Sequence, residues 1–541
     1  MEPSYAHGTS ETALLGETIG ENLDRAVARF GEREALVSVH QGLRYTYAEL
    51  GEAVQRTARA LLGAGIAAGD RVGIWSPNCA EWVLVQLATA KLGIILVNIN
   101  PAYRTSELEY ALRQSGCRML VAATAFKSSD YVAMVEEVRG GLPALEQVVF
   151  LDGWEELLAR GEGIDDALVA ERQAATQFDD PINIQYTSGT TGFPKGATLS
   201  HHNILNNGFF VGEGCGYTHE DRVCIPVPFY HCFGMVMGNL GCTSHGACMV
   251  IPAPSFEPEA TLRAVQDERC TSLYGVPTMF IAQLEHPRFA EFDLSSLRTG
   301  IMAGSPCPVE IMKRAVSEMH MEDVTICYGM TETSPVSTQT GADDTLEKRV
   351  GTVGRVHPHV EVKVIDPETG AVLPRGEPGE FCTRGYSVML GYWDEPERTA
   401  EAIDRGRWMH TGDLAVMDAD GYLNIVGRIK DLVIRGGENV YPREVEEFLM
   451  SHPDVSDVQV VGVPDERYGE ELMAFVVPRA GAEIDQAALA EFCRGRIAHY
   501  KIPRYVRCVD EFPLTVTGKV QKFKLRDQGV EELGLREVQT A

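Results

Sequence analysis

Apolar and polar positions alternate along the chain with two periods, one typical of helices and one typical of short buried strands. The segment from Glu81 to Leu92 predicts a helix that ends at Gly93, and the apolar run from Ile94 to Val97 predicts a strand directly after it. The stretch from Cys117 to Ala122 follows another helical segment in the same way. Repeated strand and helix units of this kind indicate parallel sheets covered by helices. The pattern therefore predicts an α/β fold.

The pattern changes after Gly427–Asp431, and the remainder of the chain predicts a second domain. The expected elements are a hairpin from Asp431 to Tyr441, a helix from Arg443, strands near Val458–Val463 and Leu472–Val477, and a helix around Gln486–Ile497. Such a set is sufficient for a small α+β domain with its own core. We therefore expect one domain over residues 1–429 and another over residues 430–541.

Length and charge narrow the classes of function. With 541 residues the chain exceeds a single hydrophobic core, which agrees with two or more domains. Its 48 basic and 77 acidic side chains give a formal net charge of −29. This balance argues against nonspecific nucleic-acid binding and gives no attraction to anionic lipid. Substrates that carry phosphates would therefore need local positive groups.

Cysteine spacing and the first residues bear on metal binding and on the compartment. The 13 cysteines include no Cys-x-x-Cys pair, so we predict no metal framework and expect small buried thiols. The segment from Met1 to Arg25 has neither the basic nor the apolar region of a signal peptide. The most apolar stretch, Trp82 to Val97, is too short to cross a bilayer. We therefore expect a soluble protein of the cytoplasm.

The segment from Tyr186 to Gly196, Tyr-Thr-Ser-Gly-Thr-Thr-Gly-Phe-Pro-Lys-Gly, follows a predicted strand. Its glycines let the backbone approach a ligand, while its hydroxyls and Lys195 can bind many phosphate oxygens. It is not a Walker A loop, because Pro194 takes the place of the second glycine and no Ser or Thr follows Lys195. A flexible surface loop is the alternative, but the length and order of the motif favour a triphosphate site.

The same segment resembles the signature of the adenylate-forming (AMP-binding) superfamily, which includes the acyl-CoA synthetases. Further segments resemble its other motifs, in order, over nearly the whole chain: Tyr328–Glu332, His410–Asp413, Gly427–Asp431 and Pro513–Lys519. The resemblance implies a large multi-sheet N-terminal domain with the ATP and acyl pocket, and a small mobile α+β C-terminal lid domain. It also implies an acid–thiol ligase that uses ATP with Mg²⁺, has coenzyme A as co-substrate, and serves fatty acid and lipid metabolism.

The resemblance assigns the nucleotide site. Tyr328 would stack on adenine, Thr331 would contact phosphate, and Asp413 and Arg428 would bind the ribose. A turn residue is the alternative for Asp413. The full set that would bind ATP or AMP is Thr187, Ser188, Gly189, Thr190, Thr191, Gly192, Lys195, Gly304, Ser305, Tyr328, Gly329, Met330, Thr331, Asp413, Arg428 and Lys519.

The catalytic residues implied by the resemblance are Lys519, His231, Thr187 and Glu332. Glu332, together with Thr187, would hold Mg²⁺, which accepts one or two protein carboxylates; a solvated carboxylate at a helix start is the alternative. Lys519 would bridge the acyl carboxylate and the α-phosphate, where such a cation contributes about 3–4 kcal/mol; a solvated surface lysine is the alternative. The substrate carboxylate is already nucleophilic at neutral pH, so no base is required.

Two further features belong to the transfer of the acyl group to coenzyme A. By resemblance, Lys430 is the pivot about which the small domain rotates, which withdraws Lys519 from the site. The pair Gly436 and Gly437 would then leave room for the narrow pantetheine arm. An ordinary hairpin turn explains the same two glycines, and the two interpretations are compatible.

The acyl pocket is less well defined by the sequence. His231 lies in Pro228–Gly234, which resembles the family segment beside the substrate carboxylate, although a structural histidine is the alternative. Val276, Thr278 and Ala303 resemble pocket-lining positions and are small. No charge is evident that would select a polar acid, so an aliphatic acid is expected.

The chain resembles the medium-chain branch called acyl-CoA synthetase family member 2 at Ser4–Gly8, Arg71–Asn78 and Ile94–Tyr110, which implies a medium-chain fatty acid. The alternatives are an acyl-AMP ligase and an aryl or other short-chain acid CoA ligase of the same superfamily. A non-catalytic protein of this fold would be expected to have lost Lys519, Glu332 or Lys195. The expected partners are small molecules (fatty acid, ATP and coenzyme A), with no nucleic acid and no integral membrane segment. A homodimer is compatible with the sequence, which does not fix the oligomeric state.

Overall fold

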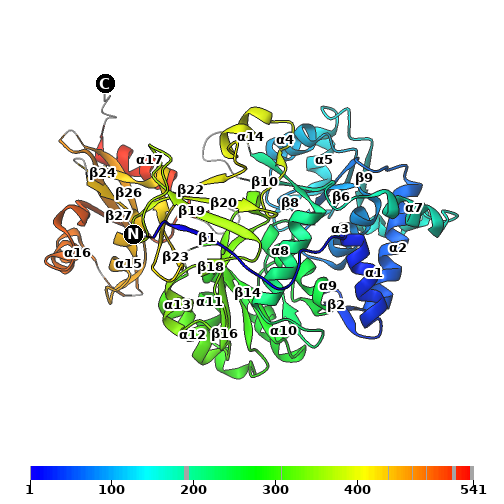
Figure 1. Ribbon diagram of the computed structural model, residues 1–541, viewed down its shortest axis with the longest axis horizontal. Helices are drawn as coiled ribbons and strands as arrows, with labels where there is room; N and C mark the ends of the chain where they lie inside the picture. Colours follow the sequence, from blue (N-terminus) through cyan, green and yellow to red (C-terminus); the bar gives the residue numbers. More distant parts are fainter. Residues whose placement is uncertain are drawn as a thin grey trace. The chain divides into compact units, whose positions relative to one another are not determined.

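The computed structural model describes residues 2–187, 194–305, 307–435, 438–465, 467–479, 481–482, 484–514 and 520–535 (Figure 1). The chain forms two compact units. The smaller one consists of residues 1–4, 363–381 and 411–541, and the larger one of residues 5–362 and 382–410. Compactness does not report motion, so the predicted boundary of a mobile domain at residue 429 stays a prediction.

The first sheet of the larger unit has seven strands. Their order is β21 (Gly391–Tyr392), β11 (Lys195–Ser200), β10 (Pro181–Thr187), β5 (Ile95–Asn98), β4 (Arg71–Trp75), β6 (Met119–Ala122) and β9 (Gln147–Phe150). The strands from β10 to β9 are parallel, whereas β11 is antiparallel to both of its neighbours. The predicted strands 94–97 and 117–122 correspond to β5 and β6.

The second sheet of this unit has nine strands. Their order is β18 (Arg355–Val356), β17 (Val336–Gln339), β16 (Asp323–Gly329), β15 (Thr299–Ala303), β14 (Ser272–Gly275), β12 (Arg222–Cys224), β13 (Cys248–Ile251), β2 (Glu34–Ser38) and β3 (Leu43–Thr46). The strands from β16 to β2 are parallel, and antiparallel strands close both edges. Parallel strands of this kind end at a common edge of the sheet.

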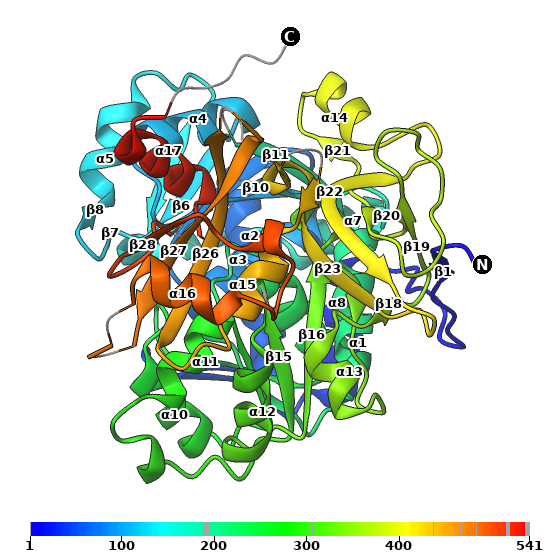
Figure 2. The ribbon, with the colours of Figure 1, turned by 90° about the vertical axis from the view of Figure 1, so that its left-hand side faces the viewer.

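Helices cover these sheets, as Figure 2 shows from a second side. They are α1 (Ile19–Phe30), α2 (Tyr47–Gly63), α3 (Ala80–Leu92), α4 (Thr105–Ser115), α5 (Tyr131–Arg139), α6 (Trp154–Ala159), α7 (Asp166–Ala175), α8 (His201–Gly214), α9 (Gly241–His245), α10 (Pro258–Asp267), α11 (Pro277–Leu284), α12 (Val309–Glu318), α13 (Leu346–Gly351) and α14 (Pro396–Ala402). Shorter elements are η1 (Leu151–Gly153), the π-helix η2 (Phe233–Leu240), η3 (Phe289–Glu291), η4 (Thr331–Thr333), and the hairpin of β7 (Ala125–Phe126) and β8 (Ser129–Asp130).

Helix α3 lies between the two sheets and confirms the predicted helix. It contacts β4 and β5 of the first sheet and β2 of the second. Every residue of α3 except Glu81 is buried, and Gly93 ends the helix in the left-handed conformation that favours glycine. A helix that is apolar on nearly all sides belongs in a protein core.

A five-stranded sheet contains β1 (Tyr5–His7), β19 (Val360–Ile365), β20 (Gly379–Gly385), β22 (Met409–Met417) and β23 (Leu423–Arg428), in that order. The boundaries of the two units fall within β19, β20 and β22.

The rest of the smaller unit is built on a second five-stranded sheet. It has the order β25 (Glu438–Val440), β24 (Val433–Arg435), β27 (Gly469–Pro478) and β26 (Val455–Asp465), with β28 (Tyr505–Cys508) paired to β27. Its helices are α15 (Pro442–Leu449), α16 (Gln486–Cys493) and α17 (Lys522–Leu533), with the short turns η5 (Ile429–Asp431) and η6 (His499–Lys501). The predicted α/β and α+β classes are confirmed.

One predicted boundary in this unit is wrong. The helix expected to reach Ile497 ends at Cys493, because Arg494 is extended and Gly495 has a φ of 74°. Neither β28 nor α17 was predicted from the pattern.

Two whole-chain expectations concern cysteines and membranes. Eleven of the cysteines are buried, which confirms the expected small buried thiols, while Cys307 is half-buried and Cys508 is exposed. Within the described ranges, no helix has both the length and the apolar character needed to span a bilayer.

Candidate nucleotide and acyl site

The β10–β11 hairpin holds the two described ends of the predicted phosphate-binding motif. Thr187 ends β10, Lys195 begins β11, and the two residues are paired in register. The loop residues Ser188, Gly189, Thr190, Thr191 and Gly192 lie outside the described residues. The structure thus places a hydroxyl and an ammonium group at the base of the predicted loop, on adjacent strands.

The Glu332 carboxylate lies beside this hairpin. It is 5% exposed, and its Oε1 accepts hydrogen bonds from the hydroxyls of Thr187 (3.4 Å) and Tyr392 (2.9 Å). The Glu332 carbonyl accepts the backbone N–H of Met389 at 2.9 Å, which fixes the main chain as well. The solvated carboxylate considered as an alternative is therefore wrong, because this group is buried and hydrogen-bonded.

Tyr392 connects Glu332 to Lys195. The Lys195 ammonium lies 3.4 Å from the Tyr392 hydroxyl and 4.5 Å from the centre of its ring. Burial, and then the negative charge of Glu332, raise the pKa of Tyr392 well above its ordinary value, so its hydroxyl is a donor at neutral pH. One cluster therefore contains a cation, a carboxylate and two hydroxyls.

Further predicted nucleotide-site and acyl-pocket residues lie at the carboxyl ends of β14, β15 and β16. Ala303 ends β15 and is paired with Cys327, so Gly304 follows next to Tyr328. Gly275 of β14 is paired with Met302, which places Val276 beside the same edge, and a Cβ on Gly304 would lie 3.1 Å from Val276 Cγ1. This edge therefore joins predicted nucleotide and acyl positions.

Close backbone packing and a hydrogen bond from a backbone N–H fix the conformation of the Tyr328–Glu332 segment. A Cβ on Gly329 would lie 1.7 Å from the Pro335 carbonyl oxygen, so only glycine fits there. The Met330 N–H donates to Thr333 Oγ1 at 3.1 Å as the chain enters the short turn η4. Tyr328, Ser305 and Met330 are half-buried, and Thr331 is 9% exposed.

The structure brings only some of the predicted acyl-pocket residues close to one another. His231 precedes the π-helix η2, and its Nδ1 accepts the N–H of Phe233 at 3.4 Å. Phe233 stacks on Tyr274, two residues before Val276, with ring centroids 5.5 Å apart. Thr278 is exposed on α11, whereas Ala303 is buried. The structure thus connects His231 to the strand that leads to Val276.

In the smaller unit, Asp413 and Arg428 face each other across β22 and β23. They are paired in register, and Arg428 Nε donates to Asp413 Oδ1 at 2.9 Å. The Asp413 side chain is 10% exposed and that of Arg428 is 54% exposed. Asp413 therefore lies within β22 and not in an isolated turn, and its role in binding the ribose stays a prediction.

The remaining predicted residues of this unit lie at or beside undescribed positions. Lys430 is in the turn η5, and Gly436, Gly437 and Lys519 lie outside the described residues. Arg435 and Glu438, which flank the two glycines, are paired in register. An isolated bridge between Leu514 and Val520 closes the base of the segment that contains Lys519.

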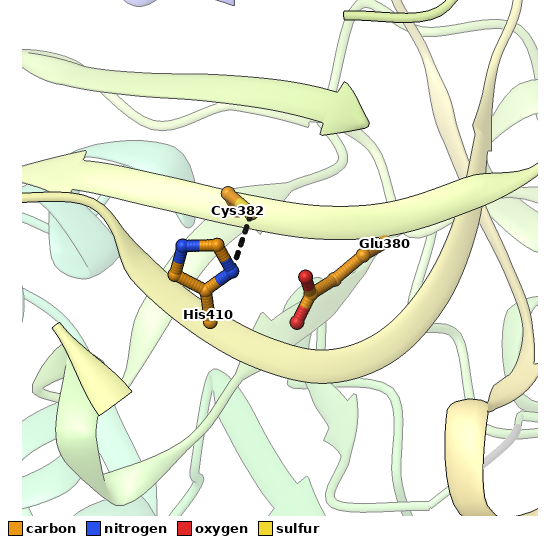
Figure 3. A group of neighbouring side chains, drawn as sticks. All are labelled: Glu380, Cys382 and His410. Atoms are coloured by element: carbon orange, nitrogen blue, oxygen red, sulfur yellow. Dashed lines mark hydrogen bonds between the residues drawn. The ribbon is translucent and has the colours of Figure 1, made fainter. Parts of the chain in front are cut away.

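Figure 3 shows a group of side chains that no motif singled out for metal binding. Cys382 Sγ and His410 Nδ1 point toward each other and lie 3.6 Å apart. His410 Nε2 is 3.7 Å from Asp404 Oδ2, and Glu380, two residues before Cys382 on β20, accepts the N–H of Gly412 at 3.3 Å. These side chains therefore have protein partners of their own.

Sequence reasoning missed Tyr392. Its only sequence signal is the Gly-Tyr pair at Gly391, which forms the two-residue strand β21 on β11. The link to Lys195 and Glu332 spans residues far apart in the chain and becomes visible only through sheet pairing.

Comparisons with known proteins agree over nearly the full length. The model of the AMP-binding enzyme family matches residues 23–393, and that of the AMP-binding enzyme C-terminal domain matches residues 444–519. The Bacillus subtilis (strain 168) protein YngI, assigned as an acyl-CoA synthetase, is 47% identical over 96% of this chain and 99% of its own. The mitochondrial medium-chain acyl-CoA ligase ACSF2 of Danio rerio is 46% identical over 99% of this chain and 92% of its own.

Among solved structures, the anthranilate CoA ligase AuaEII in complex with anthranoyl-AMP has a TM-score of 0.87 and 28% identity. The match covers 97% of this chain and 99% of that one. Family models that match more than half of the residues, together with relatives of nearly half identity over the whole length, establish the family. This chain belongs to the AMP-binding enzyme family.

Proposed function

We propose that this protein is an AMP-forming acyl-CoA ligase. In the first half-reaction a carboxylate attacks the α-phosphate of ATP, which gives an acyl-adenylate and releases diphosphate. In the second, the thiol of coenzyme A attacks the acyl carbon, which gives acyl-CoA and releases AMP. The observation that carries the proposal is the cluster at the base of the proposed phosphate-binding segment, in which buried Glu332 and Tyr392 contact half-buried Thr187 and Lys195.

The larger unit provides most of the nucleotide site in this proposal. Thr187, Lys195 and the segment 188–192 bind the phosphates, and Thr331 contacts the α-phosphate. Tyr328 stacks on the adenine at the edge where Gly304 and Ser305 follow β15. The glycine required at Gly329 supports this placement, because it brings the backbone of Tyr328 and Met330 into a tight turn.

Mg²⁺ accompanies ATP in the proposal. The oxygen donors of Glu332 and Thr187 fit this hard cation, which prefers few protein carboxylates together with phosphate oxygens and water. When bound, Mg²⁺ would offset negative charge on the phosphates. The buried carboxylate, fixed by two hydroxyls, supports this assignment.

The remaining roles belong to residues near or beyond the end of β23. Asp413 and Arg428 bind the ribose, and Lys519 stabilises the charge that develops between the carboxylate and the α-phosphate. The C-terminal domain, residues 430–541, rotates about Lys430 relative to residues 1–429. Gly436 and Gly437 then line the path of the pantetheine arm.

The proposed acid is a medium-chain fatty acid, with His231 beside its carboxylate and Val276, Thr278 and Ala303 along its chain. This choice is supported by the Danio rerio relative, which is named a medium-chain acyl-CoA ligase. Each CH₂ that enters an apolar pocket contributes roughly 0.8 kcal/mol, so the depth of the pocket sets the chain length. An aryl acid is the second candidate, because AuaEII is an anthranilate CoA ligase and its match covers 97% of this chain.

We also propose a place in fatty acid metabolism in the cytoplasm, since the YngI relative is bacterial. A homodimer remains a prediction that sedimentation equilibrium would check.

A panel of straight-chain and aromatic acids, assayed for AMP release with and without coenzyme A, tests the proposal. We expect release that depends on both the acid and coenzyme A, with a maximum at medium chain length. A maximum with an aromatic acid would replace the proposed substrate. Carboxylate-dependent diphosphate release with no acyl-CoA formed would identify an acyl-AMP ligase instead.

A further inference from the structure

The cluster around Tyr392 contains opposite charges that do not pair directly. Lys195 approaches the Tyr392 hydroxyl at 3.4 Å, and this hydroxyl donates to Glu332 at 2.9 Å. Among the residues that the structure describes, Lys195 has no carboxylate oxygen within 4.0 Å of its ammonium. The hydroxyl therefore stands between the two charges.

Direct pairing would be the expected outcome without this hydroxyl. Glu332 is buried and Lys195 is half-buried, so water screens these opposite charges only in part and they would attract each other strongly. Such a pair would withdraw both groups from a phosphate and its metal. The ring face of Tyr392 instead stabilises the ammonium by a cation–π interaction, which uses no anion.

The hydrogen bonds also select one oxygen of the carboxylate. Thr187 and Tyr392 both donate to Oε1 of Glu332. Within the described part of the chain, no hydrogen bond reaches Oε2. Oε2 thus keeps its full capacity as a ligand for a cation.

The position of Tyr392 is itself well determined. Tyr392 is paired with Ala197, two residues after Lys195 on β11, and its N–H donates to Thr399 Oγ1 at 2.9 Å. The next residue, Trp393, donates its N–H to the Gly196 carbonyl at 2.7 Å. Tyr392 as a whole is 6% exposed. A phenol held this firmly can act as a fixed spacer.

We propose that Tyr392 is a positioning residue that keeps Lys195 and Glu332 apart and leaves Glu332 Oε2 as the oxygen that binds the metal of Mg-ATP. This inference rests on the proposed function, since it assumes that Lys195 meets phosphate and Glu332 meets Mg²⁺. It assigns to Tyr392 a role in binding the nucleotide, with no part in the chemical step.

The test is equilibrium binding of ATP in the absence of any acid, measured by titration calorimetry over a range of Mg²⁺ concentrations. Tyr392→Phe removes the hydroxyl and keeps the ring. We expect its affinity for Mg-ATP to fall about tenfold, as for the loss of a hydrogen bond to a charged group. In turnover assays, KM for ATP should rise by a similar factor while kcat changes less than threefold, as roughly estimated for a binding role.

The matched control is Tyr217→Phe. Tyr217 is 5% exposed, and its hydroxyl forms a buried hydrogen bond with Ser272 Oγ at 2.6 Å, which the variant loses. This bond lies beside β12 and β14 of the second sheet. The variant should bind Mg-ATP like the unmodified protein. An equal loss of affinity in both variants would assign the effect to general destabilisation and overturn the proposal.

A double-mutant cycle with Glu332→Gln makes the test specific. If Tyr392 acts through Glu332, adding Tyr392→Phe to Glu332→Gln should weaken Mg-ATP binding by less than about twofold further. An additive tenfold loss would refute the proposal, and so would unchanged binding in Tyr392→Phe alone. Should Tyr392→Phe not fold, Tyr392→Met, which also lacks the hydroxyl, replaces it under the same criteria.

Failure of this inference is distinct from failure of the proposed function. If the unmodified protein binds no ATP and releases no AMP with any acid, the proposed function is wrong. If it does both and Tyr392→Phe matches it, only the role of Tyr392 is wrong.

Discussion

The two units treat neighbouring charges of opposite sign differently. In the smaller unit, Arg435 forms a two-pronged pair with Glu471, whose side chain is fully buried, and Nη2 lies 2.8 Å from Oε2. In the larger unit, the Tyr392 hydroxyl separates Lys195 from Glu332. The first arrangement satisfies both charges within the protein, whereas the second leaves them able to meet a ligand. The difference teaches that the manner of pairing, more than burial, distinguishes structural charges from charges that serve binding.

Glu471→Ala should break the structural pair and have the largest effect on stability. It leaves the Arg435 guanidinium buried without its carboxylate, which costs about 3–5 kcal/mol. Faster hydrogen–deuterium exchange in β26 and β27 would report the loss. All five tryptophans lie in the larger unit, so their fluorescence provides an internal control that should not change. Wild-type exchange rates would show that this pair is not structural.

Lys519→Ala should have the opposite profile, with lost activity and retained stability. We expect adenylate formation to fall by a factor on the order of hundreds to a thousand, from the loss of about 3–4 kcal/mol of transition-state stabilisation. Thioester formation from supplied acyl-AMP should change little. Diphosphate release and acyl-CoA formation, measured separately, check this prediction. Equal loss of both half-reactions would contradict the assigned role.

Acid should weaken the larger unit through two buried imidazoles. Burial lowers the pKa of His201 and of His357 from 6.5 to about 3. The unfolded chain therefore binds more protons than the folded chain between pH 6.5 and about 3, so the free energy of unfolding decreases as the pH falls through this window. The slope is up to about 1.4 kcal/mol per pH unit for each imidazole.

His357→Gln should remove the contribution of His357 to the pH dependence of the free energy of unfolding. Tryptophan fluorescence during denaturant unfolding at several pH values measures it, with the unmodified protein as reference. A slope that is the same in both proteins would exclude His357 as a source of the acid sensitivity.

Arg428→Ala should have the smallest effect on stability. Its side chain is 54% exposed, and ion pairs of this kind contribute about 1 kcal/mol or less. We nevertheless expect KM for ATP to rise, because the arginine is proposed to bind the ribose. Calorimetric unfolding and ATP titration separate the two effects. A stability loss as large as that of Glu471→Ala would remove the distinction drawn between the two kinds of pair.

The sequence was most informative where chemistry and local pattern coincide. The sequence predicted helix α3, the strand before the glycine-rich motif, and Glu332 as a candidate, each from a short segment whose residues act together. Tyr392 did not follow, because its role depends on β21 joining β11 from nearly two hundred residues away. The early end of α16 also escaped prediction, since the apolar spacing continues past the point where Gly495 turns the backbone.

Helix α3 has a consequence for synthesis of the chain in the cell. Because nearly all of its residues are buried against the helices α1, α2 and α7 and the strands β2, β4 and β5, it has no face suited to water. The last strand of the first sheet to be synthesised is β21. The apolar surface of α3 therefore stays incompletely covered while the ribosome makes the residues from α3 to β21. We therefore expect truncated forms that end before Gly391 to aggregate unless a chaperone shields them.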